Sequence, residues 1–441
     1  MNKDLTLGSP GKILIQFTLP LFISVIFQQF YNIADSVIAG KFAGEEALAA
    51  IGASYPITMI FMAVAIGCQI GCSVVISKHF GSKNFAKTKI CITTSLIAGF
   101  ILSSLLTLLG VIFSPFLMTI VNTPENIFIG GNLYLKIYTG GFVFLFLYNV
   151  TTGIFNSLGD SKTPLYLLIA SSIGNIILDA IFVITFKWNI AGVAWATFIA
   201  QGLASLVGLA ILKKRMHTLH PDKSTPLFGW QELKEIIAIA FPSILQQSFI
   251  SIGNLFVQYR VNSFGSSVIA GYSAAIKLNT FAITSFTTLG NGISSFTAQN
   301  IGAGKLNRIK EGFKSGILFA FSVALGFFIL FFFLGHFFLD LFMNKESTKL
   351  AFDTGICFLK IVSPFYFVIC IKLICDGVLR GSESMKYFMA STFTDLILRV
   401  VLAFIFSSIW AETGIWMAWP LSWFIGTAMS ALFYKKNVWV K

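Results

Sequence analysis

Two carboxylates, Asp35 and Asp179, stand inside long apolar stretches of the sequence. A charged group inside a membrane helix is costly, so a carboxylate there is a candidate functional residue. Asp35 lies six residues before Lys41 and Asp179 lies eight residues before Lys187, which places both acids at a similar depth near the ends of two predicted helices. Two nearby carboxylates in a medium of low dielectric constant cannot both stay ionised. Such a pair can take up a proton on one side of a membrane and release it on the other.

Polar side chains accompany the acids. Asn175 and Asp179 are four residues apart on one predicted helix face, and Thr197 on the next helix can face the same space. The same oxygen atoms could instead bind Na⁺. We therefore predict a cation-coupling site of Asp35, Asn175, Asp179 and Thr197 that takes H⁺ or Na⁺, with no other metal and no cofactor. The alternative, in which Asp35 only caps a helix end near the membrane surface, stays open.

Two stripes of polar residues repeat with the i, i+3, i+7 spacing of a single helix face. One is Gln28 and Tyr31 with Asp35, and the other is Asn149, Thr152 and Asn156. Converging stripes of this kind build a polar pocket inside a helix bundle.

The second half of the chain carries charges of its own. Lys372 with Asp376, and Asp395 with Arg399, are each spaced i, i+4, which favours local ion pairs. A second ion or substrate site is the alternative. Its candidates are Gln247, Lys277, Lys372 and Asp376.

The elements that hold these residues are predicted to be membrane helices. The chain has 441 residues, of which 56% are hydrophobic and 11% are charged, whereas soluble proteins have roughly 25% charged residues. The six cysteines lie in or beside apolar stretches and are expected to be small core residues. The Phe-rich run 327–338 is expected to face lipid. Apolar stretches of about 20 residues or more predict twelve spans, near 13–38, 50–77, 90–118, 132–157, 165–186, 190–212, 235–262, 268–298, 314–342, 352–379, 386–409 and 414–434.

The chain is also duplicated. Pro20 recurs at Pro242 and Gly71 at Gly292, with a nearly constant offset that other landmarks share. Each proline interrupts the first helix of its half, so Pro20 and Pro242 are predicted hinges. We predict an all-α integral membrane fold of twelve transmembrane helices in two parallel six-helix bundles, related by a pseudo-twofold axis along the membrane normal. The lobes would be 1–212 and 235–441, joined by a cytoplasmic linker at 213–234.

The net charge of +13 has a topological explanation. Most of the 31 Lys and Arg residues fall in segments that the predicted spans place on one side of the membrane, whereas the opposite loops carry four, Lys41, Lys187, Lys345 and Lys349. This asymmetry predicts that both termini are cytoplasmic, and it argues against a nucleic-acid partner. The first apolar stretch is long and contains Asp35, so we expect a retained span and not a cleaved signal. The location would be the plasma or inner membrane.

These residues resemble the multidrug and toxic compound extrusion (MATE) family over essentially the whole chain, and the branch with DinF-like and MepA-like proteins in particular. The motifs that carry the resemblance are Asn32-Ile33-Ala34-Asp35-Ser36, Gly159-Asp160-Ser161-Lys162-Thr163-Pro164, Asn175-Ile176-Ile177-Leu178-Asp179, Gly192-Val193-Ala194 and Leu379-Arg380-Gly381.

The resemblance implies export of amphipathic, often cationic compounds, driven by inward flow of H⁺ or Na⁺. It assigns Asp35, Asn175, Asp179 and Thr197 to cation coupling in the first lobe. It also assigns Gln28, Tyr31 and Asn149 to the substrate pocket, and we add Thr152 and Asn156 from the same stripe. Some members carry a glutamate on the seventh helix where this chain has Gln246-Gln247, which favours coupling in the first lobe.

The expected function is therefore a cation-coupled antiporter, with H⁺ favoured over Na⁺, that exports drugs by alternating access. The expected partners are small hydrophobic or cationic molecules and membrane lipid, and the expected state is a monomer. A lipid-linked oligosaccharide flippase of the same superfamily is the alternative within transport. An integral-membrane enzyme is disfavoured because the four histidines have no metal-binding spacing and no Gly-x-Ser-x-Gly or ATP-binding motif is present.

Overall fold

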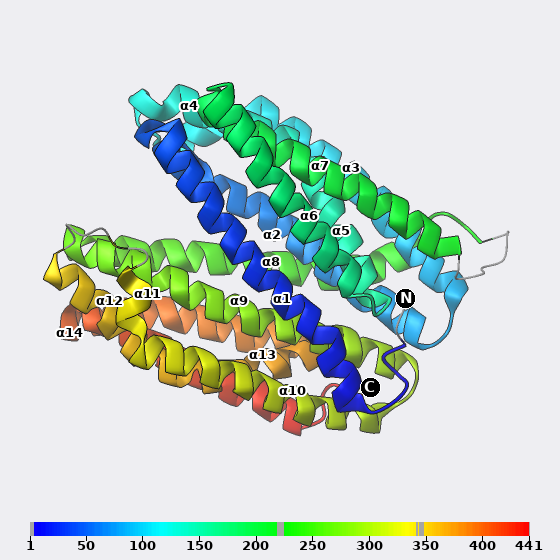
Figure 1. Ribbon diagram of the computed structural model, residues 1–441. Coiled ribbons are helices and arrows are strands. Elements are labelled where there is room, and N and C mark those ends of the chain that lie inside the picture. Colours follow the sequence, from blue (N-terminus) through cyan, green and yellow to red (C-terminus); the bar gives the residue numbers. More distant parts are fainter. Residues whose placement is uncertain (1–3, 218–224, 341–342, 344–347, 441) are drawn as a thin grey trace. The chain divides into compact units, whose positions relative to one another are not determined.

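A computed structural model describes residues 4–217, 225–340, 343 and 348–440 of the chain. Every regular element in this part of the chain is a helix (Figure 1).

In the first half of the chain, the described residues form seven α-helices and two short π-helices. They are α1 (Pro10–Ile38), η1 (Ala39–Ala43), α2 (Glu45–Gly81), α3 (Phe85–Ile120), α4 (Glu125–Gly140), α5 (Phe142–Ser157), α6 (Lys162–Asp179), η2 (Ala180–Thr185) and α7 (Asn189–Met216).

The second half has a similar order of helices. They are α8 (Trp230–Asn262), α9 (Ser266–Gly302), α10 (Leu306–Phe328), η4 (Ile329–Phe333), α11 (Gly335–Asp340), α12 (Lys349–Val362), η5 (Ser363–Phe365), α13 (Tyr366–Gly381) and α14 (Met385–Lys435).

The described helices account for the twelve expected membrane spans. Nine are long and apolar enough to cross a membrane, and α4 with α5, bent by 46° at Gly141, makes a tenth. The 51-residue α14 contains two helices, because Trp410 and Ala411 inside it have non-helical backbone angles. The remaining span is α9, whose 37 residues suffice in length but include many Ser, Thr and Asn residues that lower its hydropathy. The predicted fold class is confirmed.

The chain forms two compact units, and two helices belong to both. Unit 1 contains Ile23–Ser248 and also Asp4 from the described N-terminal residues, and unit 2 contains Leu5–Phe22 and Phe249–Lys441. The chain therefore passes between the units inside α1 and inside α8. The predicted division into lobes at the linker 213–234 stays a prediction. The two crossings between the units lie elsewhere, inside α1 and α8.

Repeated glycines explain how these helix segments pack. In unit 1, Gly71 of α2 lies so close to Ala240 of α8 that a methyl group at Gly71 would overlap it. In unit 2, Gly292 of α9 lies equally close to Thr18 of α1. Each duplicated glycine thus lets a helix of one half approach the first helix of the other half closely.

The turn before the second helix is also the same in both halves. The second helix of each half begins after a glycine with positive φ, Gly44 (φ 96°, ψ 166°) and Gly265 (φ 93°, ψ 168°). A residue with a Cβ atom rarely adopts this backbone conformation. The two halves therefore share the same loop geometry at this point.

The motif at 159–164 is a helix start. The Asp160 carboxylate accepts hydrogen bonds from the Thr163 backbone N–H at 3.1 Å and from its hydroxyl at 2.8 Å. It also pairs with Arg215 near the end of α7 at 3.2 Å. These contacts satisfy the first turn of α6 and tie α6 to α7.

The expectation that the run 327–338 faces lipid is wrong in part. Phe333 is 64% exposed, but Phe327 and Phe331 are buried. Phe331 packs against Tyr366, and Phe327 packs against Phe286, with ring centroids 6.3 and 5.9 Å apart. A helix made of phenylalanine on every face presents some of them to the core of unit 2.

Candidate functional site

In unit 1 the carboxyl groups of Asp35 and Asp179 meet. They lie within hydrogen-bonding contact of each other. Asp179 is fully buried and Asp35 is partly buried. Asp35 comes shortly before η1, Asp179 comes directly before η2, and these two π-helices pack against each other. Short π-helical segments inside α-helices are frequent at functional sites.

The contact between the two acids lacks a donor. The Oδ1 atoms of Asp35 and Asp179 are both buried and have no hydrogen-bond donor among the described residues. Two ionised carboxylates offer only acceptors, so a hydrogen bond between them requires a proton on one of them. A proton or a bound cation would supply the partner that the two carboxylates lack.

Asn175 orients toward the acids through its amide nitrogen. When the amide is turned so that both of its ends are satisfied, the nitrogen donates to Asp179 Oδ2 at 2.9 Å. The oxygen then accepts from the Thr197 backbone N–H at 3.0 Å. Asn175 is 2% exposed, so the arrangement is shielded from solvent.

Two tyrosines complete the surroundings of the pair. The Tyr31 side chain is hydrogen-bonded to that of Thr197 and interacts electrostatically with both acids. Tyr134 of α4 interacts with both acids in the same way. Tyr134 was not among the predicted site residues, although its spacing of four residues from Tyr138 in an apolar stretch puts two hydroxyls on one helix face.

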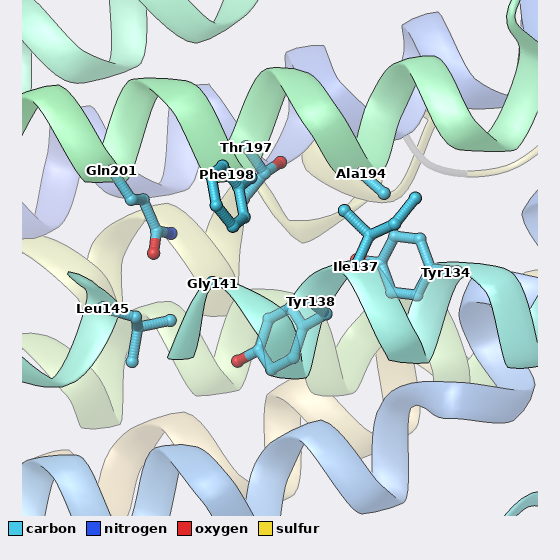
Figure 2. A pocket seen from close by; sticks show the side chains of 9 residues that line it. All are labelled: Tyr134, Ile137, Tyr138, Gly141, Leu145, Ala194, Thr197, Phe198 and Gln201. Carbon is cyan, nitrogen blue, oxygen red and sulfur yellow. The ribbon is translucent and has the colours of Figure 1, made fainter. Parts of the chain in front are cut away.

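A small cavity of unit 1 adjoins these residues. Figure 2 shows side chains of α7 pointing toward those of α4 and α5 across it. Tyr134 and Thr197 belong to its wall, so the cavity and the surroundings of the acid pair share residues. Its wall is aromatic, aliphatic and amide in character and consists of Tyr134, Ile137, Tyr138, Gly141, Leu145, Ala194, Thr197, Phe198 and Gln201.

The residues predicted for the substrate pocket are spread along two helices. Tyr31 lies beside the acids, whereas Gln28 is exposed on α1. On α5, Asn149 donates to the Leu145 carbonyl of its own helix at 2.8 Å. Their assignment to substrate stays a prediction.

The rest of the α5 stripe is also partly buried. The Thr152 hydroxyl is hydrogen-bonded to Tyr148, one turn earlier on the helix. Asn156 keeps a buried Oδ1 atom that accepts no hydrogen bond within the described residues. Such a side chain is available to a polar ligand.

In unit 2 the predicted ion pairs are joined into one network. Lys372 Nζ lies 2.7 Å from Asp376 Oδ2 and 3.8 Å from Asp395 Oδ2, and Arg399 lies 3.6 Å from Asp395 Oδ1. The first three side chains are 5% exposed or less. Local pairs at i, i+4 are thus present, and Lys372 links them across α13 and α14.

The other candidates of the second half lie on different helices. Lys277 is exposed on α9, and Gln247 is partly buried on α8. Among the described residues no group of three or more His, Cys, Asp and Glu side chains is placed to hold a metal ion. Pro20 lies within α1, close to the point where that helix passes from unit 2 to unit 1, and Pro242 lies within α8.

Duplicated membrane helices with an acid pair beside a small cavity define a membrane transporter. The MatE family model matches residues 20–181 and 242–405, which is most of the chain. The protein therefore belongs to the MatE family, as its resemblance to multidrug and toxic compound extrusion proteins predicted.

Similar proteins agree with this assignment. The chain is 27% identical over 443 residues to "Probable multidrug resistance protein YpnP" of Bacillus subtilis (strain 168), covering 99% of this chain and 97% of that one. It is 22% identical over 404 residues to "Multidrug export protein MepA" of Staphylococcus aureus (strain bovine RF122 / ET3-1), covering 92% and 89%.

A solved structure has the same fold. It is described as the outward-facing conformation of a multidrug resistance MATE family transporter of the MOP superfamily. Its TM-score is 0.93 at 22% identity, covering 99% of this chain and 97% of that one. These relatives are transporters and not enzymes, so the protein is a multi-pass membrane transporter for small molecules.

Proposed function

We propose that this protein is a proton-coupled antiporter that exports amphipathic, often cationic drugs by alternating access. The observation that supports it most is the contact between Asp35 and Asp179, whose buried Oδ1 atoms have no donor among the described residues. A proton that enters the pair makes the missing hydrogen bond, and its departure leaves two acceptors that repel each other. Substrate movement would be coupled to this exchange.

The Asn175 amide can meet the pair in two orientations. Its nitrogen donates to the Thr197 hydroxyl at 3.3 Å or, with the amide turned, to Asp179 Oδ2 at 2.9 Å. The turned amide supports a carboxylate that exchanges a proton, whereas an amide oxygen facing Asp179 would complete the Na⁺ ligands predicted from Asp35, Asn175, Asp179 and Thr197. Export under a pH gradient and under a Na⁺ gradient distinguishes the two ions.

The cavity beside the pair has room for about one water molecule, so an amphipathic substrate would enter there only after the surrounding helices move apart. Its wall offers two tyrosine rings, one phenylalanine ring and the Gln201 amide, and it contains no charged side chain. Tyrosine and phenylalanine faces attract organic cations, and the nearby acids add negative charge whenever they are deprotonated. Gln28, Tyr31, Asn149, Thr152 and Asn156 remain our candidates for further contacts to the substrate.

The proposal extends to the location, topology and oligomeric state of the protein. We infer a plasma-membrane or inner-membrane protein with both termini in the cytoplasm, surrounded by lipid and active as a monomer. H⁺ is the only cosubstrate that it needs, and Gln247, Lys277, Lys372 and Asp376 are candidates for a second site. The positive-inside distribution of Lys and Arg supports the orientation.

Ethidium export from proteoliposomes tests the function. We expect wild-type protein to export ethidium under an imposed pH gradient and to respond little to a Na⁺ gradient. Asp35→Asn and Asp179→Asn should each lower gradient-driven export by at least about tenfold, because the proton-carrying pair is lost, an effect within the range of roughly 5–150-fold that is typical of coupled sites. Asp353→Asn, a change of one carboxylate on α12 of unit 2, serves as the matched control.

The outcomes separate the alternatives. Export that needs Na⁺ would keep the site and replace the ion. Undiminished proton-driven export by both Asp35→Asn and Asp179→Asn would refute the proposed coupling site. Lack of ethidium export by the wild type under either gradient would contradict the drug-antiporter proposal itself.

A further inference from the structure

The residues before α1 form a short segment that is seated on unit 2. Leu5 is completely buried and Thr6 is 2% exposed. The segment lies where α9 ends and α10 begins, because its partners are Gln299, Asn300, Lys305 and Arg308.

In this segment, the four carbonyls from Leu5 to Gly8 each receive a hydrogen bond from a cation. Arg308 donates to the carbonyls of Gly8 at 2.6 Å, Leu7 at 3.1 Å and Leu5 at 3.3 Å. Lys305 Nζ donates to the carbonyl of Thr6 at 2.9 Å. Hydrogen bonds from a charged donor are roughly twice as strong as neutral ones. Four consecutive carbonyls held in this way make a specific attachment and not a chance surface contact.

Buried amides hold the segment and Arg308 in place. Asn300 Oδ1 accepts from Arg308 Nε at 3.0 Å, and Gln299 Oε1 accepts from the Leu5 backbone N–H at 2.9 Å. Both amide side chains are fully buried. We name Gln299, Asn300, Lys305 and Arg308 the N-terminal clamp.

The clamp fixes one end of the helix that carries Asp35. Beyond the clamp, Thr18 of α1 packs against Gly292 within unit 2. The helix passes to unit 1 between Phe22 and Ile23, just after Pro20, and Asp35 lies in unit 1. A displacement of Asp35 relative to unit 2 must therefore be absorbed within α1 beyond Thr18.

The second half of the chain has a corresponding attachment, with fewer hydrogen bonds among the described residues. The Gly229 backbone N–H, just before α8, donates to Thr94 Oγ1 of α3 at 2.9 Å. His79 of α2 lies 3.4 Å from Glu235 of α8. Both contacts are inside unit 1. The duplication therefore fastens the start of each first helix to the other half, and the arginine fastens α1 most extensively.

We propose that Arg308 is a positioning residue for transport, which keeps the start of α1 fixed to unit 2 throughout the transport cycle. Uptake or loss of a proton at Asp35 can then act on unit 2 through α1. This proposal rests on the proposed proton coupling in unit 1. Without the clamp, α1 would move at its free end and the coupling would be lost while the substrate pocket stays intact.

Arg308→Ala tests the clamp in two measurements on the full chain. In hydrogen–deuterium exchange, peptides that cover residues 5–22 should exchange at least about tenfold faster, since three hydrogen bonds from a charged donor are lost. In proteoliposomes under a pH gradient, the maximal rate of ethidium export should fall about tenfold, with the half-saturating ethidium concentration unchanged within about twofold. Arg308→Lys should recover part of both, because an ammonium can reach fewer carbonyls.

Lys310→Ala is the matched control, because Lys310 is exposed on the same helix and carries the same charge. It should leave both measurements at wild-type values. If Arg308→Ala does not fold, Lys305→Ala removes a single hydrogen bond and should shift both measurements in the same direction by less. Unchanged exchange at 5–22, or faster exchange with a wild-type export rate, overturns the proposal. A wild type without gradient-driven export would refute the proposed function instead, since the exchange result is independent of transport.

Discussion

The two buried carboxylates of unit 2 are satisfied very differently. Asp376 accepts from Lys372 at 2.7 Å and from the Ser430 hydroxyl at 2.7 Å, with further hydroxyls beside it. Asp395 has a buried Oδ1 atom with no hydrogen bond in the described part of the chain, and its partner Arg399 is 3.6 Å away. Arg399 also lies over the Trp419 ring, at 4.4 Å from its centroid.

Removal of Lys372 is therefore expected to be more damaging than removal of Arg399. Lys372→Met leaves two buried carboxylates without their shared cation, which should cost about 3–5 kcal/mol. Arg399→Met leaves Asp395 with Lys372 and keeps an apolar contact to Trp419, so we expect a cost of roughly 1–2 kcal/mol. The measurement is the midpoint of thermal unfolding in detergent.

Lys360→Met, at an exposed lysine of α12, provides the control and should shift the midpoint little. Equal shifts for the Lys372 and Arg399 variants would show that the network does not depend on the central lysine.

The sequence identified the residue types of the candidate site but not its orientation. Charge in an apolar stretch singled out Asp35 and Asp179, because burial of an acid is costly wherever it occurs. Tyr134 carries no charge and resembles any tyrosine in a membrane helix. The direction of the Asn175 amide depends on which neighbours it meets, and no spacing rule contains that information.

At the scale of elements, close approach of two helices depends on single glycines. Gly71 leaves no room for a methyl group against the Ala240 backbone, whereas Gly52 of the same helix has open space around it. Small residues at such crossings are typical of membrane helices that pack closely.

Gly71→Ala should therefore destabilise the protein, and Gly52→Ala should not. We expect Gly71→Ala to cost about 1–3 kcal/mol, because the inserted methyl forces α2 and α8 apart. Gly52→Ala should be neutral or stabilising by up to about 1 kcal/mol, since alanine favours a helix. Thermal unfolding midpoints of the two variants measure the difference, and a neutral Gly71→Ala would contradict the packing at this crossing.

Most helices follow from the apolar stretches, but their interruptions do not. Burial of a membrane-length apolar segment requires a helix, because its backbone groups must bond internally. The π-helix η2 contains no proline or glycine, and η1 contains only Gly40, so the sequence does not predict either of them. Both lie next to the contact of Asp35 and Asp179, which is a tertiary feature.

For the whole molecule, the apolar composition predicted the fold class, and the internal sequence duplication predicted two similar halves. The division of α1 and α8 between the two units could not be predicted in this way. It depends on which helices pack together at Gly71 and Gly292, and a glycine in the sequence does not name its neighbour. The nearly constant offset of the repeat shows that the two halves are equivalent. It does not show that each half packs part of its first helix against the other half.

The expected topology can be measured on the whole protein in cells. Lys187 and Lys436 are both exposed and are predicted to lie on opposite sides of the membrane. A membrane-impermeant maleimide should label Lys187→Cys in intact cells and Lys436→Cys only after permeabilisation. Wild-type protein, whose six free cysteines are partly or fully buried, gives the background. The reverse pattern would refute cytoplasmic termini.

The packing of Thr18 on Gly292 and of Ala240 on Gly71 has a consequence for the origin of the chain. If a six-helix ancestor was duplicated, its first helix had its partner glycine in another copy. Two such copies would have exchanged identical helices, which is domain swapping in a symmetric dimer. Gene fusion would then have made the helix exchange between two molecules a permanent feature of a single chain. The separate halves of the present chain should accordingly depend on each other to fold.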